Sequence, residues 1–166
     1  MNFEDVIRER FSARSFKDEK VKKDELDKIL EAGRLAPTAK NNQPIKIYVI
    51  ESEEALKKIN ECSPCIYGAK TVLLVCGNKE LAFHKGDYST YEMDATIVAT
   101  HMMLEACNVG INSVWVEMFD KDKIKEYCNI PEEPVCLIPL GYKKDDCIPS
   151  PMHNIRKDIS ELVEYL

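Results

Sequence analysis

Two arginines and a serine alternate with apolar residues in one short stretch, Arg10-Phe11-Ser12-Ala13-Arg14. If this stretch is extended, Arg10, Ser12 and Arg14 point to one side and Phe11 and Ala13 to the other, because successive side chains of an extended chain alternate. Two guanidinium groups and a hydroxyl on one side form a receptor for phosphate, since arginine pairs bidentately with oxyanions. The spacing equally permits a plainer role, in which Arg10 neutralises the C-terminal carbonyls of a preceding helix.

Three further stretches could contact a ligand. The loop Ala36–Pro44 carries asparagine and glutamine amides, whose paired donors and acceptors suit the polar edge of a heterocyclic ring. Residues Trp115–Asp120 are typical of a strand end that leads into a helix cap, where backbone amides are free to bond a ligand. The tail after Tyr142 carries His153, Arg156 and Lys157. Each stretch alone is also typical of an ordinary connecting loop, of core packing or of a solvated face.

Cys62-Ser63-Pro64-Cys65 has the CxxC spacing of redox and metal motifs. A thioredoxin-type motif follows a strand and opens a helix, whereas here a predicted helix precedes the motif and a predicted strand follows it. No second CxxC is present to complete a zinc site, and the three histidines are isolated, so we expect no metal site. The motifs GxGxxG, GxxxxGKS/T and GxSxG are also absent, so neither a dinucleotide-binding, a P-loop nor a serine-hydrolase fold is indicated.

The elements that must position these stretches alternate along the chain. Helices are predicted from the N-cap Asn2 to Arg8, from Asp24 until Pro37 stops the helix, over 53–60, over 88–107, and from the cap Asp120 to Cys128. Strands are predicted over 46–50, 71–76, 112–116 and 135–140. This interleaving predicts one α/β or α+β domain, residues 1–166, with a central sheet.

The composition is that of a soluble globular protein: 45% of the 166 residues are hydrophobic and 31% are charged. The net charge of −6 argues against binding to nucleic acid or to an anionic membrane. No apolar run is long enough to span a bilayer, and the acidic start Met1–Asp5 is unlike a signal peptide. With seven cysteines, an odd number, and no export signal, we expect reduced thiols and a cytoplasmic location.

The predicted helix over 88–107 is apolar nearly all the way round. Such a helix is buried on several sides, and in so small a protein part of that burial is expected against a second subunit.

Taken in order, these stretches resemble the nitroreductase family of flavin mononucleotide (FMN) oxidoreductases. The resemblance runs from Met1 to Leu166. It is carried by four features: Arg10 to Phe16, Ala36-Pro37 leading into Asn41-Asn42-Gln43-Pro44, Gly110 through Trp115 to Phe119, and Pro131 followed by Val135 to Tyr142.

The resemblance implies a three-layer fold, with a central and mostly antiparallel sheet flanked by helices, in an intertwined homodimer with two FMN sites at the subunit interface. Arg10 and Ser12, with Phe11 beside them and Arg156 from the tail, would hold the phosphate and ribityl end. Arg14 would lie near the pyrimidine side of the flavin ring. The loop residues that would reach the flavin of the other subunit are Pro37, Thr38, Ala39, Asn41 and Gln43.

The backbone N–H of Glu117 would approach flavin N5, with Met118 beside the ring. Several positions depart from the family pattern. Met118 stands where glycine is common, Ile45 where many relatives have tryptophan, Lys143 where many have proline, and Asn154 where many have lysine. His153 or Lys157 could replace the missing tail lysine. The chain is also too short for the inserted helices that cover the active site of larger relatives, so a more open pocket is expected.

By this resemblance, hydride passes from NAD(P)H through flavin N5 to a nitro compound, quinone or similar small acceptor, by a ping-pong mechanism. The flavin performs the chemistry, so no side chain is expected to act as a catalytic acid or base. One alternative is a flavin-binding or sensor module of the same fold without efficient turnover. Another is a thiol-based redox protein that uses Cys62 and Cys65.

Overall fold

Four strands form one antiparallel sheet in this computed structural model, which describes all residues from 1 to 166. Their order across the sheet is β1 (Ile45–Ile50), β2 (Thr71–Gly77), β6 (Glu133–Gly141) and β5 (Asn112–Ser113). Every neighbouring pair is antiparallel, so of the two predicted classes the fold is α+β. The prediction of a central and mostly antiparallel sheet is confirmed.

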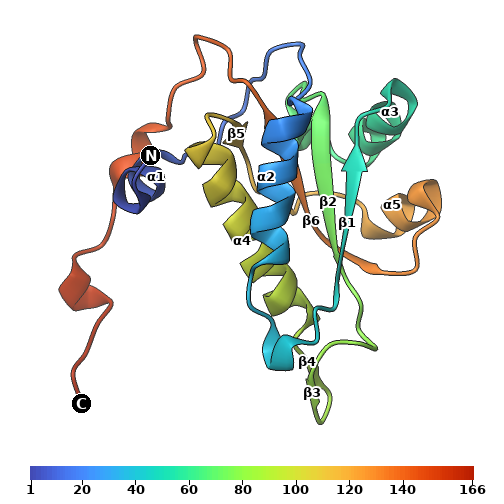
Figure 1. The fold of residues 1–166 in the computed structure, drawn as a ribbon, viewed down its shortest axis with the longest axis vertical. Coiled ribbons are helices and arrows are strands. Elements are labelled where there is room, and N and C mark those ends of the chain that lie inside the picture. Colours follow the sequence, from blue (N-terminus) through green and yellow to red (C-terminus); the bar gives the residue numbers. More distant parts are fainter.

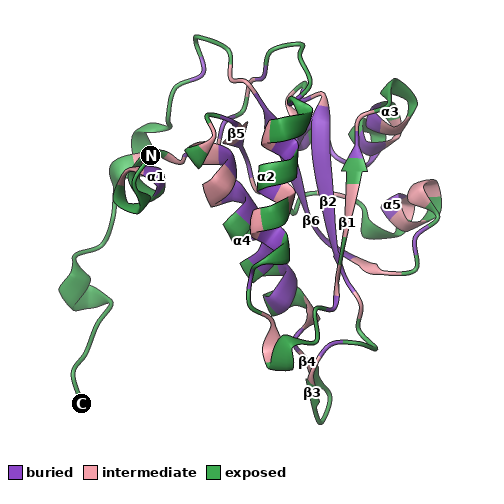
Figure 2. Ribbon diagram, viewed as in Figure 1, coloured by how far each residue is buried: buried purple, intermediate pink, exposed green.

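Helices cover both faces of this sheet (Figure 1). α2 (Lys23–Arg34) and α4 (Tyr91–Asn108) lie against one face, and α3 (Glu53–Cys62) and α5 (Lys121–Cys128) lie against the other. β2 is buried along its whole length, and its side chains alternate between the two cores (Figure 2). Leu74 packs with α3 and α5, whereas Leu73 packs with α2 and α4. The predicted three-layer arrangement is therefore confirmed.

Helix ends follow the predicted caps. Asn2 accepts a hydrogen bond from the Asp5 amide at the start of α1 (Phe3–Glu9), and Asp120 accepts one from the Lys123 amide at the start of α5. These side chains satisfy amides that have no partner inside the helix. The predicted helices over 2–8, 24–36, 53–60 and 120–128 are thus present, with ends that differ by a few residues.

Two predicted boundaries are wrong. The long helix begins at Tyr91 instead of 88, because β4 (Tyr88–Ser89) pairs with β3 (His84–Lys85) in a hairpin whose turn uses the left-handed Gly86. The strand predicted over 112–116 is regular only at Asn112–Ser113. The Val114 amide donates to the Pro139 carbonyl, but Pro139 has no N–H to return the bond, so the ladder breaks there.

The C-terminal tail leaves the body of the protein after Cys147 (Figure 1). It passes α1 and then runs away from the other elements, with two short 3-10 turns, η3 (Pro151–Asn154) and η4 (Ile159–Glu161). Two further 3-10 turns, η1 (Ala39–Asn41) and η2 (Pro64–Ile66), lie in the loops before β1 and β2. None of the helices combines the length and the apolar character needed to cross a membrane.

Because both faces of the sheet are covered, truncating a β2 side chain on either face is expected to lower the stability of the protein. Leu73→Ala and Leu74→Ala remove side chains that are 0% exposed, and each should lower the free energy of unfolding by about 2–5 kcal/mol. Val49→Ala, at an exposed position of β1, is the control and should cost far less. Urea denaturation of the three variants measures this. A β2 variant as stable as the control would contradict a two-sided core.

Candidate functional site

The segment Arg10–Phe16 is extended and runs along the edge of the sheet beside β5. The Ala13 amide donates to the Ser113 carbonyl at 3.0 Å, and Ser12 forms a parallel bridge with Ser113. Phe11 and Ala13 are buried, whereas the alternate residues Arg10, Ser12 and Arg14 are partly or fully exposed. The predicted alternation is confirmed, and it presents two guanidinium groups and a hydroxyl on one side.

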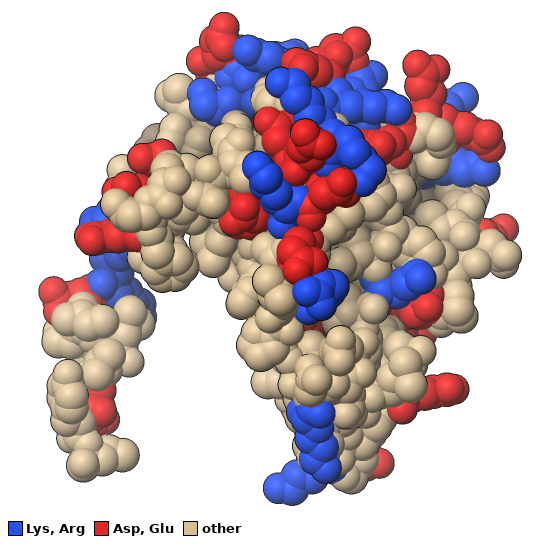
Figure 3. Space-filling model, viewed as in Figure 1, with Lys and Arg blue, Asp and Glu red and all other residues tan.

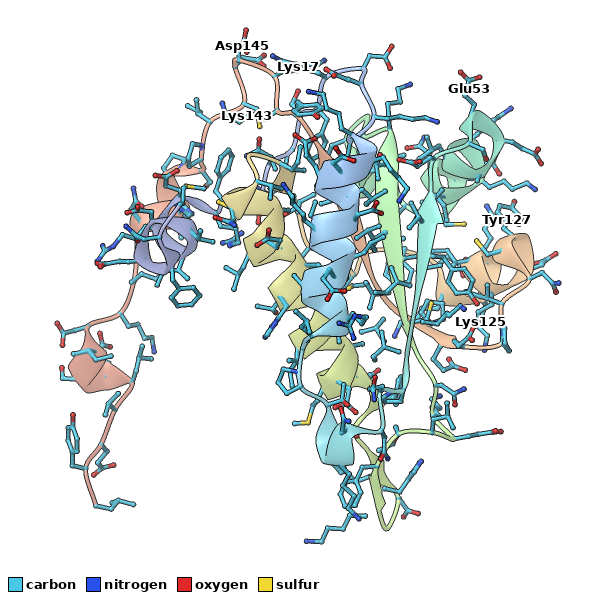
Figure 4. All side chains as sticks on the ribbon, in the orientation of Figure 1. Lys17, Glu53, Lys125, Tyr127, Lys143 and Asp145 are labelled. Carbon is cyan, nitrogen blue, oxygen red and sulfur yellow. The ribbon has the colours of Figure 1, made fainter.

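The far end of this segment is fixed to the chain that follows β6. Phe16 bridges Lys143, and the Lys17 amide donates to the Tyr142 carbonyl at 2.8 Å. Figure 4 shows Lys17, Lys143 and Asp145 together at this end of the molecule, where Lys17 and Asp145 form an ion pair at 3.4 Å. Backbone pairing at both ends therefore holds the segment in place, while the side chains of Arg10 and Arg14 remain at least partly exposed.

Arg14 has a neighbour that the sequence did not reveal. Its guanidinium donates weakly to the Ser12 carbonyl at 3.5 Å and also lies beside Tyr67. A hydrogen bond with the Cys65 thiol and burial raise the pKa of Tyr67. The positive charge of Arg14 acts in the other direction and lowers this pKa in part. Tyr67 follows η2 and has a left-handed backbone with φ of 53°. The turn after α3 thus places a phenol against the arginine that is predicted to face the flavin ring.

The loop Ala36–Pro44 is fixed by a buried carboxylate of α4. Asp94 is only 2% exposed; its Oδ1 accepts from the Ala39 amide at 2.8 Å, and its Oδ2 accepts from the Thr90 hydroxyl at 2.8 Å. A buried charge is tolerated only where hydrogen bonds replace its hydration. No periodicity or motif marks Asp94 in the sequence, so its role in the loop was missed.

Further hydrogen bonds close the loop on itself. The Thr38 hydroxyl accepts from the Gln43 amide at 3.0 Å, and three residues have the left-handed backbone that non-glycine residues seldom adopt, Lys40, Asn41 and Gln43. Pro37, Asn41 and Gln43 are exposed. Thr38 and Gln43 also line a hollow of about 250 Å³ between α2 and β1. Strained backbone of this kind is concentrated at ligand sites, where the surrounding contacts maintain it.

Trp115–Asp120 offers free backbone amides, as predicted. Val116 exchanges two backbone hydrogen bonds with Leu137, at 3.0 and 2.9 Å. The next amide, that of Glu117, has no acceptor in the protein, and the residue is exposed. The Glu117 carboxylate accepts from the Trp115 indole at 2.8 Å, and Met118 is 65% exposed. An N–H held in place by its neighbours but left without a partner is suited to a ligand acceptor.

The tail approaches the segment Arg10–Phe16 through His153. Its ring packs edge-on against Phe11, with 6.2 Å between ring centres, and its Nε2 lies 3.2 Å from the Arg8 carbonyl. His153, Asn154 and Arg156 line a hollow of about 280 Å³ with Ile7 and Arg8 of α1. Arg156 is thus brought to α1, beside Arg8, which the sequence did not single out. Arg10 and Ser12 do not line this hollow.

Apart from Arg156, which lies at α1, the predicted residues fall into two groups. Arg10–Arg14 and Glu117–Met118 lie around the β5 edge, together with Tyr67, which the sequence did not indicate. The loop 36–44 lies at the opposite end of α2, a helix of 12 residues and thus about 18 Å long (Figure 1). One chain therefore does not bring the two groups together.

The two thiols of the CxxC motif are free and buried. Burial raises the pKa of the Cys62 thiol above its ordinary value, so the reactive thiolate is disfavoured. No three histidine, cysteine, aspartate or glutamate residues are placed to hold a metal ion. A thiol-based redox centre is therefore poorly supported by the structure.

Known proteins resemble this chain in both sequence and fold. A family model described as the nitroreductase family matches residues 7–63 and 62–142. The chain belongs to the nitroreductase family. A solved nitroreductase family protein from Clostridium difficile 630 is 36% identical with a TM-score of 0.91, over 99% of this chain and 98% of that one.

Other nitroreductase family relatives are more distant. A protein of Archaeoglobus fulgidus that carries the name NADH dehydrogenase/NAD(P)H nitroreductase is 31% identical over 150 residues, or 85% of each chain. A Bacillus subtilis protein named FMN reductase (NAD(P)H) is 32% identical over 104 residues, which is 60% of this chain and 42% of that protein. The similarity to the Clostridium protein covers nearly the full length of both chains, so a short chain without large insertions occurs elsewhere in the family.

Removing the buried carboxylate should release the loop 36–44. In Asp94→Ala, the Ala39 amide and the Thr90 hydroxyl lose their acceptor, so the free energy of unfolding should fall by about 1.5–3 kcal/mol. Amide hydrogen exchange over residues 39–43 should become faster. Glu92→Ala, an exposed acid in the same turn of α4, is the matched control. Equal exchange in both variants would show that Asp94 does not fix the loop.

Proposed function

We propose that this nitroreductase family protein is an FMN-dependent oxidoreductase that uses NAD(P)H to reduce a nitro compound, a quinone or a similar small acceptor. The observation that carries the proposal is the exposed and unpartnered Glu117 amide, which lies in the same group as the exposed arginines of the segment Arg10–Arg14. An anion receptor and a fixed N–H donor are what a phosphorylated flavin needs at its two ends. The names of the Archaeoglobus and Bacillus relatives agree with this reaction class.

The residues present fit FMN. Arg10 and Ser12, with Phe11 beside them, would hold the phosphate and ribityl end, assisted by Arg156 from the tail. Arg14 would place positive charge near the pyrimidine side of the ring, and the Glu117 amide would donate to N5, with Met118 against the ring. The loop residues Pro37, Thr38, Ala39, Asn41 and Gln43 would complete the site from the other subunit.

When bound, FMN supplies the hydride chemistry at N5, so the protein needs no catalytic acid or base. The protein positions the ring, offers the N–H of Glu117 and supplies the charge of Arg14. Donor and acceptor use the same open pocket in turn, in a ping-pong sequence. NAD(P)H as donor and seven cysteines without a disulfide both suit a reducing compartment such as the cytoplasm.

The functional unit we propose is a homodimer. The two groups of site residues lie at opposite ends of α2, so a second copy is needed to bring a loop 36–44 to the β5 edge. Exposed apolar side chains mark the surface that this copy would cover: Phe3 and Ile7 of α1, Met93 and Ile97 of α4, and Ile155, Ile159, Leu162 and Tyr165 of the tail. Figure 3 shows that charged side chains gather at the top of the molecule, while the tail shows apolar surface interspersed with charged side chains. Exposed apolar side chains in this number are typical of an interface.

A second candidate function is a flavin-binding module without efficient turnover. It is favoured by Met118, whose exposed side chain stands next to the free Glu117 amide, at a position where glycine is common in the family pattern. Both candidates require bound FMN, and they differ in whether a nicotinamide reduces it.

Anaerobic titration of the purified protein tests the proposal. Protein that is yellow after incubation with FMN, and that is bleached by NADH or NADPH, supports the oxidoreductase. Yellow protein that neither nicotinamide bleaches indicates the module. Protein that takes up no FMN contradicts both functions. Unchanged turnover of a Cys62→Ser, Cys65→Ser variant would also confirm that the thiols take no part.

The phosphate receptor can be tested by removing one charge. Arg10→Ala should weaken FMN binding about 10- to 100-fold, because a charge-assisted hydrogen bond contributes about 1.5–3 kcal/mol. Lys57→Ala removes an equal charge from the exposed surface of α3 and should leave the affinity unchanged. Fluorescence titration of apoprotein with FMN measures both. Equal dissociation constants for the two variants would remove Arg10 from the site.

Arg14 should act on the reduced state of the cofactor. A positive charge near the pyrimidine side stabilises the anionic reduced ring, so Arg14→Ala should lower the midpoint potential of bound FMN by about 30 mV, which is a tenfold difference in relative affinity for a two-electron couple. Anaerobic redox titration against a reference dye measures the change. An unaltered potential together with an unaltered rate of reduction by NAD(P)H would contradict this role.

A further inference from the structure

The loop before β1 is joined to the hairpin of β3 and β4 by hydrogen bonds. The Asn42 side-chain amide donates to the Leu81 carbonyl at 3.0 Å. Asp94 accepts from the Ala39 amide of the loop through one carboxylate oxygen, at 2.8 Å. Through the other oxygen it accepts from the hydroxyl of Thr90, which ends the hairpin, also at 2.8 Å. One buried carboxylate therefore holds both segments in place.

A further contact between the two segments orients a charge of the loop. The Lys40 ammonium lies over the Phe83 ring, 4.5 Å from the ring centre, in a cation–π contact. Lys40 also has a left-handed backbone, with φ of 53°. A non-glycine residue keeps such a backbone only where the surrounding contacts maintain it. Residues 36–44 and 81–90 thus form one unit, which we name the arm.

The hairpin presents a second lysine on the same side of the arm. The Thr90 amide donates to the Phe83 carbonyl at 3.0 Å, so the pairing of β3 with β4 extends to Phe83. Side chains alternate along an extended strand, which places Lys85 on the same face of the hairpin as Phe83. This is the face over which the Lys40 ammonium lies. Two cations of the arm are therefore neighbours.

These two cations are not neutralised by the rest of the chain. Lys40 and Lys85 are exposed, and neither forms an ion pair. Asp87 lies in the hairpin turn, two residues after Lys85, but it forms no ion pair with either lysine. Figure 3 shows Lys and Arg side chains together at the lower tip of the molecule, where Figure 1 places the hairpin. In a protein with a net charge of −6, this tip is a local site for an anion.

We propose that Lys40 and Lys85 bind a phosphate group of the nicotinamide nucleotide. This inference rests on the proposed function, in which the loop 36–44 reaches the flavin of the other subunit. Because the arm is one unit, the hairpin accompanies the loop to that flavin. Figure 1 shows the hairpin extending past the loop, so its lysines lie farther out than the loop residues that would contact the ring.

The chemistry of the donor matches this placement. The nicotinamide ring must approach the flavin, whereas the phosphates of the same molecule are separated from that ring by a ribose. Cations at the outer part of the arm therefore suit the phosphates and leave the ring free to react. Lysine binds phosphate as a mobile point charge, so it requires no exact geometry at an exposed site.

The donor offers two kinds of phosphate. A diphosphate is present in both NADH and NADPH, whereas the 2′-phosphate is present only in NADPH. The two can be distinguished by comparing NAD⁺ with NADP⁺, the oxidised nucleotides, which bind without reducing the flavin.

The test measures the dissociation constants of NAD⁺ and NADP⁺ for the FMN-loaded protein by isothermal titration calorimetry. Lys40→Gln and Lys85→Gln should each raise the constant about three- to fivefold, as expected for the loss of one exposed charge pair. The double variant should raise it about tenfold or more. Lys40→Arg keeps the charge and should bind as the wild type does. Lys57→Gln removes an exposed charge from α3 and is the matched control.

Each outcome bears on the inference. A higher constant for both nucleotides assigns the lysines to the diphosphate, and a higher constant for NADP⁺ alone assigns them to the 2′-phosphate. Constants equal to those of Lys57→Gln for both nucleotides would overturn the inference, while reduction of the bound FMN by NAD(P)H would leave the proposed function intact. Wild-type protein whose FMN neither nicotinamide reduces would contradict the proposed oxidoreductase, and the role of the two lysines with it.

Discussion

The two central strands, β2 and β6, are apolar on both faces, and the rest of the structure depends on this constraint. A sheet of this kind must be covered on each side, which requires two layers of helices and buries most of the chain between them. Polar groups that could bind a ligand are left only at the margins of the sheet. The segment 10–16 lies beside β5, the loop 36–44 leads into β1, and residues 114–120 leave β5. The candidate site therefore lies at the edges of the sheet, and backbone groups form a large part of it.

Edges of one sheet can be far from one another, and this explains why the proposed site residues lie in two separate places on one chain. The segment Arg10–Phe16 and the Glu117 amide share the β5 edge, whereas the loop 36–44 lies beyond the C-terminal end of α2 (Figure 1). Apolar residues that are exposed on α1, α4 and the tail provide a surface on which a second chain can supply the missing loop. In this proposal, the site is complete only when two chains form the dimer.

Much of this arrangement could be predicted from the sequence. Apolar runs such as Thr71–Cys76 and caps such as Asp120 depend on local chemistry, so they indicated most elements and their boundaries, while the three layers were implied by the family resemblance. The alternation in Arg10–Arg14 predicted correctly which side chains are exposed. What could not be predicted depends on contacts between distant residues. Pro139 ends the β5 ladder only because it lies opposite Val114, and Asp94 acts through a bond to Ala39, 55 residues away. A local sequence pattern does not reveal which distant residues are in contact.

We propose that FMN binds across three separate segments, two from one chain and one from its partner. Hydrogen–deuterium exchange of the apoprotein, with and without FMN, tests this most directly, because it reports on every segment at once. We predict slower exchange over residues 10–16, 38–43 and 117–119, and unchanged exchange in the central strand β2, which contributes no residue to the proposed site. Protection that leaves 117–119 unchanged, or that omits 38–43, would contradict the account.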